Sequence, residues 1–200
     1  MSHARVLKRQ PLRIGGGALN RRRLQSLPGL SVRPTSARVR QALFNMLRDR
    51  IEDAIFVDLF AGTGSVGLEA LSHSARQIYF IESDRRAVLA LRSNIERCGV
   101  ADRTTVIAAA LPQALHRLPL GLQADILFLD PPYASDLAEM TLALLQASPV
   151  LAPHGTMIWQ HAAQRQVPNE ILGRRCLKCR RYGETQLSVF GTEHATCPAG

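Results

Sequence analysis

The chain has 200 residues, of which 46% are hydrophobic, so it can fold as one domain around a substantial core. No apolar run is long enough to span a bilayer, and the charged N-terminus lacks the apolar centre of a signal peptide, so we expect a cytoplasmic protein that does not bind membranes. The net charge of +9 comes almost entirely from arginine and favours an anionic partner such as a nucleic acid.

The first 40 residues are strongly basic, and the first acidic residue of the chain is Asp49. We expect residues 1–40 to form a basic N-terminal arm, with a glycine triplet and an arginine triplet in a hairpin or loop. The planar guanidinium group suits phosphates, so the clustering predicts contact with nucleic acid; the alternative is a solvated basic tail. The basic residues of the arm are Arg5, Lys8, Arg9, Arg13, Arg21, Arg22, Arg23, Arg33, Arg38 and Arg40.

A helix is expected to begin at Thr35 or Ser36, either of which can cap it, and to run to about Arg50. Apolar residues recur along it at spacings of three and four. Arg38 and Arg40 fall in its first turn, where a positive charge opposes the helix dipole. This placement indicates either a nearby anion or simple tolerance of a small penalty.

From residue 55 onwards, short apolar segments alternate with amphipathic helical segments, a pattern typical of a parallel sheet covered on both faces. We predict a Rossmann-like α/β fold with a mostly parallel seven-stranded sheet and a C-terminal antiparallel hairpin that turns at Gly183. The domain is expected over residues 41–191, followed by a mobile tail over 192–200. The segments expected as strands are 55–60, 77–81, 104–108, 125–129, 156–161, 176–182 and 185–190, and those expected as helices are 64–73, 85–98, 112–117 and a segment around Met140 to Leu145.

A glycine-rich turn, VDLFAGTGSVGLEAL over residues 57–71, joins the first strand to the next helix. Glycine tolerates positive φ and lets a ligand approach the backbone, while the helix start offers unpaired N–H groups. Gly62, Gly64 and Gly67 fit GxGxxG, and Glu82 follows Gly62 by 20 residues, which is also the spacing of a dinucleotide site. The turn therefore indicates a nucleotide-type cofactor, with a purely structural turn as the alternative.

A second motif, DPPY over residues 130–133, directly follows the fourth strand. Strands one and four are neighbours in doubly wound sheets, and ligands bind outside their carboxyl ends. The two prolines keep the backbone extended, so the Asp130 carboxylate and nearby carbonyls are expected to face the site, with Tyr133 as a stacking platform. Acceptors beside a flat ring suit a planar base with an exocyclic amino group.

Four cysteines, Cys98, Cys176, Cys179 and Cys197, do not indicate a disulfide framework in a chain of this size. Cys176 and Cys179 form a lone CxxC without a second close pair, so we expect reduced cysteines and no metal site.

At the level of whole motifs, the sequence resembles the RsmD-type family of bacterial methyltransferases. The resemblance runs from about Arg13 to Phe190 and rests on RIGGGALNRRRL, RPTSARVRQALFNML, DLFAGTGSVGLEAL, FIESD, DPPY and YGETQLSVF, in that order. It implies a class I methyltransferase fold, S-adenosyl-L-methionine as the cofactor, and transfer of a methyl group to the exocyclic amino group (N2) of one guanine in 16S ribosomal RNA. The resemblance also implies that the partner is this RNA within a small-subunit particle and that the protein is a monomer.

The resemblance also implies roles for individual residues. Asp130, the Pro131 carbonyl and Tyr133 would orient and stack the target base. Glu82 would bind the ribose hydroxyls, and Asp58 the amino-acid end of the cofactor. The full cofactor set is Asp58, Phe60, Gly62, Gly64, Glu82, Ser83 and Asp130, and the RNA set is Arg21, Arg22, Arg23, Arg33 and Arg38; Thr35 joins the residues near the cofactor or target.

One departure from the family is the run Ala108 to Ala110, where many relatives carry an acid that contacts adenine. Backbone groups and apolar packing, for example from Leu111, would then recognise the adenine. Three other functions stay open at this point: a DNA adenine amino-methyltransferase, which DPPY suits equally; a nicotinamide-dependent oxidoreductase; and a non-catalytic RNA-binding protein. The absence of a separate target-recognition domain disfavours the first, and DPPY with the basic arm disfavours the second.

Overall fold

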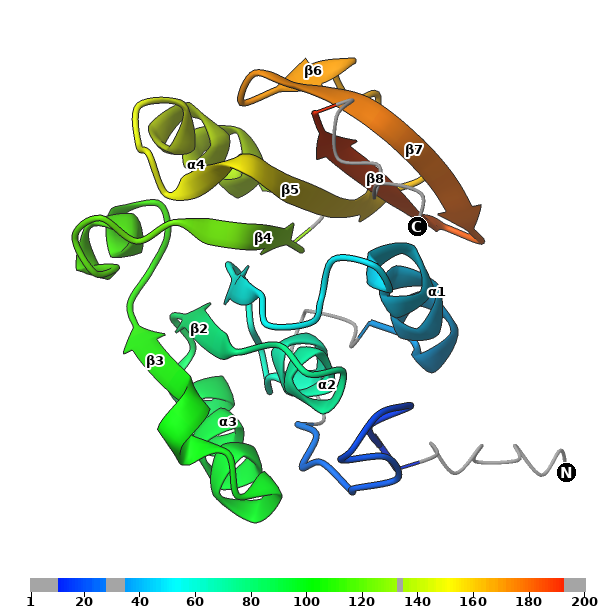
Figure 1. Cartoon of the computed structure of the whole chain (residues 1–200), viewed down its shortest axis with the longest axis vertical. Coiled ribbons are helices and arrows are strands. Elements are labelled where there is room, and N and C mark those ends of the chain that lie inside the picture. The colour runs from blue at the N-terminus through cyan, green and yellow to red at the C-terminus, as the bar shows by residue number, and fades with distance from the viewer. Residues whose placement is uncertain (1–10, 28–34, 133–134, 193–200) are drawn as a thin grey trace, which may run out of the picture.

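The computed structural model describes residues 11–27, 35–132 and 135–192, and these residues form a single mixed sheet flanked by helices (Figure 1). The elements alternate as expected. They are α1 (Ala37–Leu47), β1 (Ile55–Asp58), α2 (Ser65–Ser72), β2 (Gln77–Glu82), α3 (Arg85–Cys98), η1 (Ala101–Arg103), β3 (Thr104–Ala108), η2 (Gln113–Arg117), β4 (Ala124–Leu129), α4 (Leu137–Gln146), β5 (Leu151–Ala162), β6 (Glu170–Ile171), β7 (Arg174–Tyr182) and β8 (Thr185–Gly191).

The sheet has the strand order β3-β2-β1-β4-β5-β8-β7-β6. Strands β1 to β5 pair in parallel, and β5, β8, β7 and β6 pair antiparallel. The predicted fold class is therefore confirmed, and the two-residue strand β6 adds an eighth strand to the seven expected. The chain order reverses between β1 and β4, which places the ends of these two strands side by side, as the sequence predicted.

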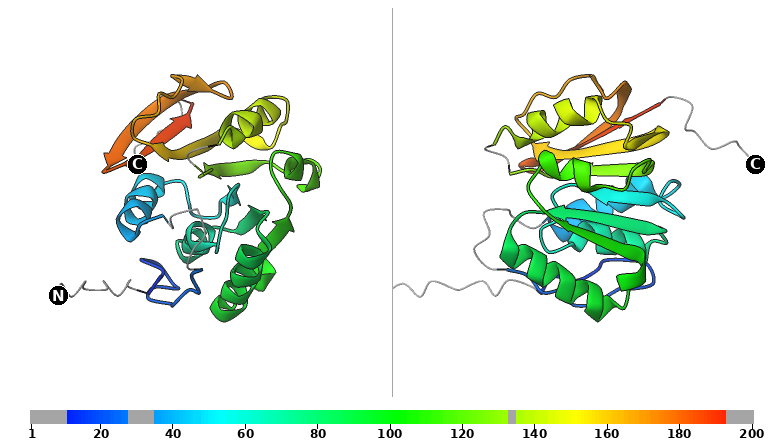
Figure 2. Two further views of the ribbon diagram at one scale, coloured as in Figure 1. Left: turned by 180° about the vertical axis from the view of Figure 1, so that it is seen from behind. Right: turned by 90° about the vertical axis from the view of Figure 1, so that its left-hand side faces the viewer.

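Two apolar layers cover the two faces of the sheet, because successive residues of a strand point to opposite sides. Phe56 on β1 and Ile126 on β4 pack with α1, α2 and α3, whereas Val57 and Leu127 pack with η2 and α4. Figure 2 shows the helices on either side of the sheet, with α3 at the end opposite the β7–β8 hairpin. Both faces of β1 and β4 are thus buried, which explains their continuous apolar sequences.

The described part of the basic N-terminal segment packs against the domain. Arg13 and Arg23 form an antiparallel bridge, and Ile14 and Leu24 are buried in the layer that holds α1 and α2. The segment lies beside α2 (Figure 1), where the Ala18 amide donates to the Ser72 carbonyl at 2.8 Å. The division of the chain at residues 40 and 191 stays a prediction, and the tail beyond residue 192 lies outside the described residues.

Several element boundaries differ from the prediction. Helix α1 ends at Leu47 rather than near Arg50, and Ser36, not Thr35, caps it by accepting from the Val39 amide at 3.3 Å. Strand β5 begins at Leu151 rather than Thr156, because its first residue already pairs with Ala124 across an irregular register. Among the helices that the structure describes, none is long and apolar enough to cross a membrane.

Candidate functional site

In the glycine turn after β1, two glycines pack tightly against neighbouring side chains and a third faces open space. A Cβ on Gly64 would lie 2.3 Å from the Leu91 side chain, and one on Gly67 would lie 2.3 Å from Phe80. Gly62 has φ of +54° and Gly64 of +83°, the left-handed region that favours glycine. A Cβ on Gly62 would meet nothing within 4 Å, so this part of the turn faces open space where a ligand can approach the backbone.

Asp58 ends β1 beneath this turn and is almost fully buried, with 1% of its surface exposed. Its Oδ2 atom accepts from the Gly67 amide at 3.3 Å, whereas Oδ1 has no hydrogen-bond partner in the described structure. Burial and, secondarily, the negative charge of Asp130 raise the pKa of Asp58 to about 8. A buried carboxylate oxygen without a donor is costly, and a cationic ligand would relieve that cost.

Glu82 is the last residue of β2, and its carboxylate accepts hydrogen bonds both from the glycine turn and from the residues just before α3. Its Oε2 atom accepts from the Gly62 amide at 2.7 Å, and Oε1 accepts from the Ser83 and Asp84 amides, each at 2.7 Å. A carboxylate offers about four acceptor positions, so Glu82 retains acceptor capacity for a ligand hydroxyl. Ser83 is exposed beside it, and Phe60 is half-buried.

Asp130 directly follows β4 and is held from two distant parts of the chain. Its Oδ2 atom accepts from the Thr35 hydroxyl at 3.1 Å and from the Gln160 amide nitrogen Nε2 at 2.8 Å. Burial raises the pKa of Asp130 to about 7, and these two hydrogen bonds oppose the shift. Because β1 and β4 are parallel neighbours, Asp58 and Asp130 lie at the same edge of the sheet.

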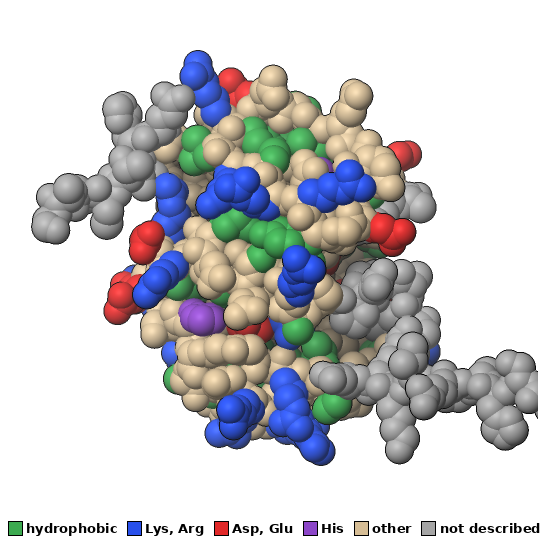
Figure 3. All heavy atoms as spheres, turned by 90° about the vertical axis from the view of Figure 1, so that its right-hand side faces the viewer, with side chains coloured by type: hydrophobic (Ala, Val, Ile, Leu, Met, Phe, Trp, Pro, Cys, Tyr) green, Lys and Arg blue, Asp and Glu red, His purple; other side chains and the backbone are tan. Residues whose placement is uncertain are grey.

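The remaining predicted residues of the base site and RNA site are distributed as follows. Pro131 is buried next to Asp130, whereas Tyr133 and Arg33 lie outside the described residues. Arg38 is exposed on α1, and Arg21, Arg22 and Arg23 are exposed on the N-terminal segment. Arg22 also donates to the Arg97 carbonyl at 3.0 Å. Figure 3 shows Lys and Arg side chains spread over the face that carries α1 and the β7–β8 hairpin.

A buried ion pair that the sequence did not reveal supports this edge of the sheet. Arg40 and Glu69 are each 2% exposed, and Arg40 Nε donates to Glu69 Oε2 at 2.8 Å. Arg40 also donates to the Thr35 carbonyl at 2.9 Å and to the Arg13 carbonyl at 2.7 Å. The anion near the first turn of α1 is therefore Glu69 of α2, and Arg40 orients the same Thr35 that contacts Asp130.

Two buried side-chain amides near the site, those of Gln160 and Asn94, were also not predicted from the sequence. Trp159 on β5 pairs with Leu129 on β4. Gln160 and Asp130 are the residues that follow this pair, so the Gln160 side chain reaches Asp130. Asn94 on α3 donates to the Thr63 carbonyl of the glycine turn at 2.9 Å and accepts from the Gln25 amide at 2.7 Å. For Gln160 the signal available in the sequence was a polar residue beside the apolar run of a buried strand, where it requires a specific partner. Asn94 stands among polar residues of α3 and carried no such signal.

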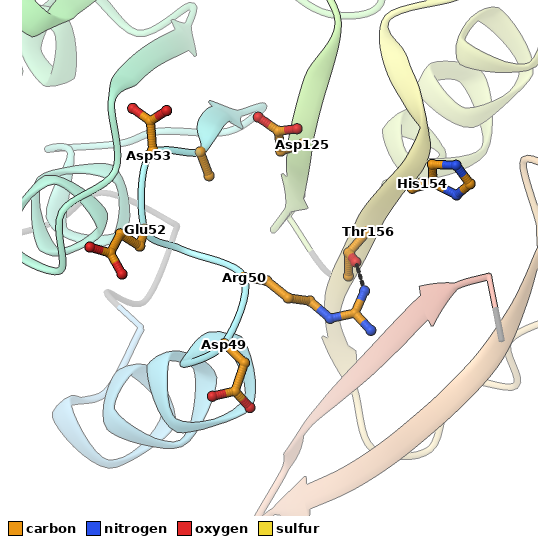
Figure 4. A pocket seen from close by; sticks show the side chains of 8 residues that line it. Asp49, Arg50, Glu52, Asp53, Asp125, His154 and Thr156 are labelled. Carbon is orange, nitrogen blue, oxygen red and sulfur yellow. Dashed lines mark hydrogen bonds between the residues drawn. The ribbon is translucent and has the colours of Figure 1, made fainter. Parts of the chain in front are cut away.

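A separate hollow of about 370 Å³ lies at the opposite, amino edge of the sheet. Figure 4 shows its side chains, which come from the segment between α1 and β1 and from the amino-terminal halves of β4 and β5. Arg50 donates to the Thr156 hydroxyl at 2.8 Å within it. Its four acids, Asp49, Glu52, Asp53 and Asp125, are all exposed.

Known proteins resemble this chain over most of its length. A family described as "Conserved hypothetical protein 95" matches residues 12–191. "Ribosomal RNA small subunit methyltransferase D" of Escherichia coli strain K12 is 34% identical over 157 residues, 78% of each chain. The Haemophilus influenzae protein of the same name is 34% identical over 145 residues, covering 72% of this chain and 75% of its own.

A solved structure described as "Putative methyltransferase yhhF from Escherichia coli" superimposes with a TM-score of 0.80 at 31% identity. The match covers 92% of this chain and 98% of that one. The fold and the extent of these matches agree with the family that the motifs resembled. The chain belongs to the RsmD family of methyltransferases.

Proposed function

We propose that the protein transfers a methyl group from S-adenosyl-L-methionine to the exocyclic amino group (N2) of a guanine in 16S ribosomal RNA. The observation that carries this proposal is the pairing of two buried carboxylates, Asp58 and Asp130, at the ends of neighbouring strands. One lies under a glycine turn and the other is fixed by Thr35 and Gln160. The names of the E. coli and H. influenzae relatives support ribosomal RNA of the small subunit as the substrate.

The described residues fit the methyl donor, which carries an ammonium group and a sulfonium centre. The unpartnered Oδ1 of Asp58 lies where a cation would be stabilised, and Gly62 leaves open space above the turn. Glu82 would accept from the ribose hydroxyls with its remaining acceptor capacity. The donor supplies an electrophilic methyl group. The protein therefore has to bind the donor, orient it towards the acceptor and exclude competing groups.

Asp130 acts on the other reactant, the base. The guanine amino group is a weak nucleophile, because its lone pair is delocalised into the ring. Oxygen acceptors at Asp130 and the Pro131 carbonyl would orient this group towards the donor, and Tyr133 would stack on the ring. Holding two reactants in line lowers the barrier by several kcal/mol. The base has to leave its stack to reach the sheet edge, as in other enzymes that modify bases.

Exposed arginines extend the site into an RNA-binding surface. Arg21, Arg22, Arg23 and Arg38 are exposed, and Arg33 belongs to the same proposed set. Guanidinium groups bind RNA phosphates and make affinity fall with added salt. We further propose that the protein acts as a monomer in the cytoplasm and meets its RNA within a small-subunit particle.

Methyl transfer from radiolabelled S-adenosyl-L-methionine tests the proposal. The acceptors are naked 16S RNA, small-subunit particles lacking the modification, and DNA carrying unmethylated adenines. We expect label in RNA, with particles labelled faster than naked RNA. Label in DNA alone would contradict the proposal and favour the adenine-directed alternative, and label in neither nucleic acid would refute nucleic-acid methylation.

A further inference from the structure

Two cysteine side chains on β7 lie close together on the surface of the hairpin. Cys176 Sγ and Cys179 Sγ are 3.1 Å apart, and both residues are free thiols. Residues three apart in a regular strand point to opposite faces, but the register shifts between Cys176 and Lys178. This bulge brings both thiols to one face of the strand, so the sequence CxxC becomes a contact pair.

A hydrogen-bonded chain leads from this pair into the sheet. Cys179 Sγ lies 3.3 Å from Ser188 Oγ, which lies 2.8 Å from Nε2 of His161. The other ring nitrogen, Nδ1, lies 2.9 Å from the Ala162 carbonyl, which can only accept, so Nδ1 carries a proton. Burial lowers the pKa of His161 and so favours the neutral ring, in which Nε2 accepts from Ser188. Ser188 can in turn accept from the Cys179 thiol.

The two thiols differ in their surroundings. Cys179 is exposed and contacts Ser188, whereas Cys176 is half-buried. Burial and the hydrogen bond with Cys179 raise the pKa of Cys176 to about 11. Cys176 therefore holds its proton, while Cys179 has a route along which to release one. Strand β6 pairs with Arg174 and Arg175 and leaves the Cys179 section of β7 accessible.

We propose that Cys176 and Cys179 form a peroxide-reactive thiol pair in which Cys179 reacts first and Cys176 closes a reversible disulfide. Cys179 passes its proton through Ser188 to His161 as its sulfur attacks one peroxide oxygen. An S–O bond forms, the O–O bond breaks, and the departing hydroxide takes the proton back from His161 and leaves as water. The Cys176 sulfur then attacks the Cys179 sulfur; the S–S bond forms, the S–O bond breaks, and a second water leaves. Both sulfurs are oxidised and one peroxide is reduced.

The geometry requires little movement for this closure. A disulfide sulfur–sulfur bond is about 2 Å long, so the thiols have to approach by roughly 1 Å. Disulfides in reducing compartments are transient and are reversed by cellular thiols. The modification would lie on the basic strand that carries Lys178, Arg180 and Arg181.

Oxidation of the full-length protein by stoichiometric hydrogen peroxide tests this inference, with intact mass and peptide mapping as readouts. We expect a loss of two hydrogens, a Cys176–Cys179 linkage, and full reversal by dithiothreitol. In Cys176→Ser, dimedone should trap a sulfenic acid on Cys179, whereas Cys179→Ser should leave Cys176 unmodified. A Cys98→Ser variant is the matched control and should oxidise like the wild type.

The relay is tested by Ser188→Ala, with Ser188→Thr restoring the hydroxyl. We expect the alanine variant to oxidise about tenfold more slowly, because solvent replaces only part of a general-base contribution that is usually about 10²–10⁴-fold. Unchanged kinetics would refute the relay. A thiol pair that stays reduced, a linkage through Cys197, or oxidation of Cys176 in Cys179→Ser would overturn the proposal.

Discussion

The two edges of the parallel sheet carry similar acids in opposite environments. At the carboxyl edge, Asp58 and Asp130 are buried, and their pKa values rise to about 8 and about 7. At the amino edge, Asp53 and Asp125 are exposed around an open hollow. Burial at the carboxyl edge thus makes the charge of a carboxylate depend on the ligand that binds beside it.

The two edges of the sheet also differ in the burial of a nearby ion pair. Arg40 and Glu69 are each 2% exposed, whereas Arg76 and Asp53 are 55% and 77% exposed and 3.9 Å apart. We expect Glu69→Gln to lower the free energy of unfolding by about 3–5 kcal/mol, since it leaves a buried guanidinium without its counter-ion. Urea unfolding measures this change.

The matched control for that variant is Asp53→Asn, which should change the same free energy by about 0–1 kcal/mol. Equal effects of the two variants would mean that the buried pair contributes no more than the exposed one, and the contrast between the edges would not extend to stability.

Removing the carboxylate of Asp130 should abolish most of the methyl-transfer activity. We expect Asp130→Ala to lower the single-turnover rate of methyl transfer by about 10²-fold or more, because the target amino group loses its orientation. Circular dichroism and thermal melting establish that the variant folds. Asp125→Asn, at the amino edge of the same strand, should retain the wild-type rate; a wild-type rate in Asp130→Ala would remove Asp130 from the reaction.

Donor binding should depend on pH through Asp58. Its pKa of about 8 means that the free protein holds a proton there at neutral pH, and a cationic donor favours the ionised form. Affinity should therefore rise from pH 6 to pH 8, by at most about tenfold per unit, with release of a proton. Calorimetry in buffers of different ionisation enthalpy measures both quantities, and Asp58→Asn should abolish the dependence.

The same pKa shift affects stability in the opposite sense. The folded protein binds the Asp58 proton more tightly than the unfolded chain, so this contribution to stability is complete below the ordinary Asp pKa. It is lost as the pH rises towards about 8. Thermal melting of the wild type and Asp58→Asn without donor should show this difference, and equal pH profiles would contradict the shifted pKa.

The smallest expected effect concerns RNA affinity. Replacing Arg21, Arg22 and Arg23 by glutamine should reduce the slope of log affinity against log salt by about 0.7–0.9 for each phosphate that is no longer neutralised. Arg76→Gln, at the amino edge, should leave the slope unchanged. A slope unaffected by the triple substitution would exclude this part of the arm from phosphate binding.

The sequence predicted those features that repeat or lie close together in the chain. Alternating apolar segments indicated the parallel strands, and the doubly wound topology typical of that pattern predicted that β1 and β4 would be neighbours, which the strand order confirms. The glycine turn and Asp130 could be identified for the same reason, since each follows a buried strand directly.

The supporting contacts could not be predicted, because they join residues far apart in the chain. Thr35 and Asp130 are 95 positions apart, and Arg40 and Glu69 are 29 apart. Such pairs leave no periodicity, and each residue alone has ordinary alternatives: a helix cap for Thr35, a solvated charge for Arg40. The bulge that brings Cys176 to Cys179 likewise depends on the strand register, which the spacing of the cysteines does not specify.

The identity of the methylated nucleoside tests the central proposal most directly. Small-subunit particles lacking the modification are incubated with the protein and S-adenosyl-L-methionine, the RNA is digested to nucleosides, and the products are separated by liquid chromatography and mass spectrometry. We predict a single new product, N2-methylguanosine, formed by the wild type and lost in Asp130→Ala. A methyl group on adenosine, on the ribose or on a ring carbon would contradict the proposal.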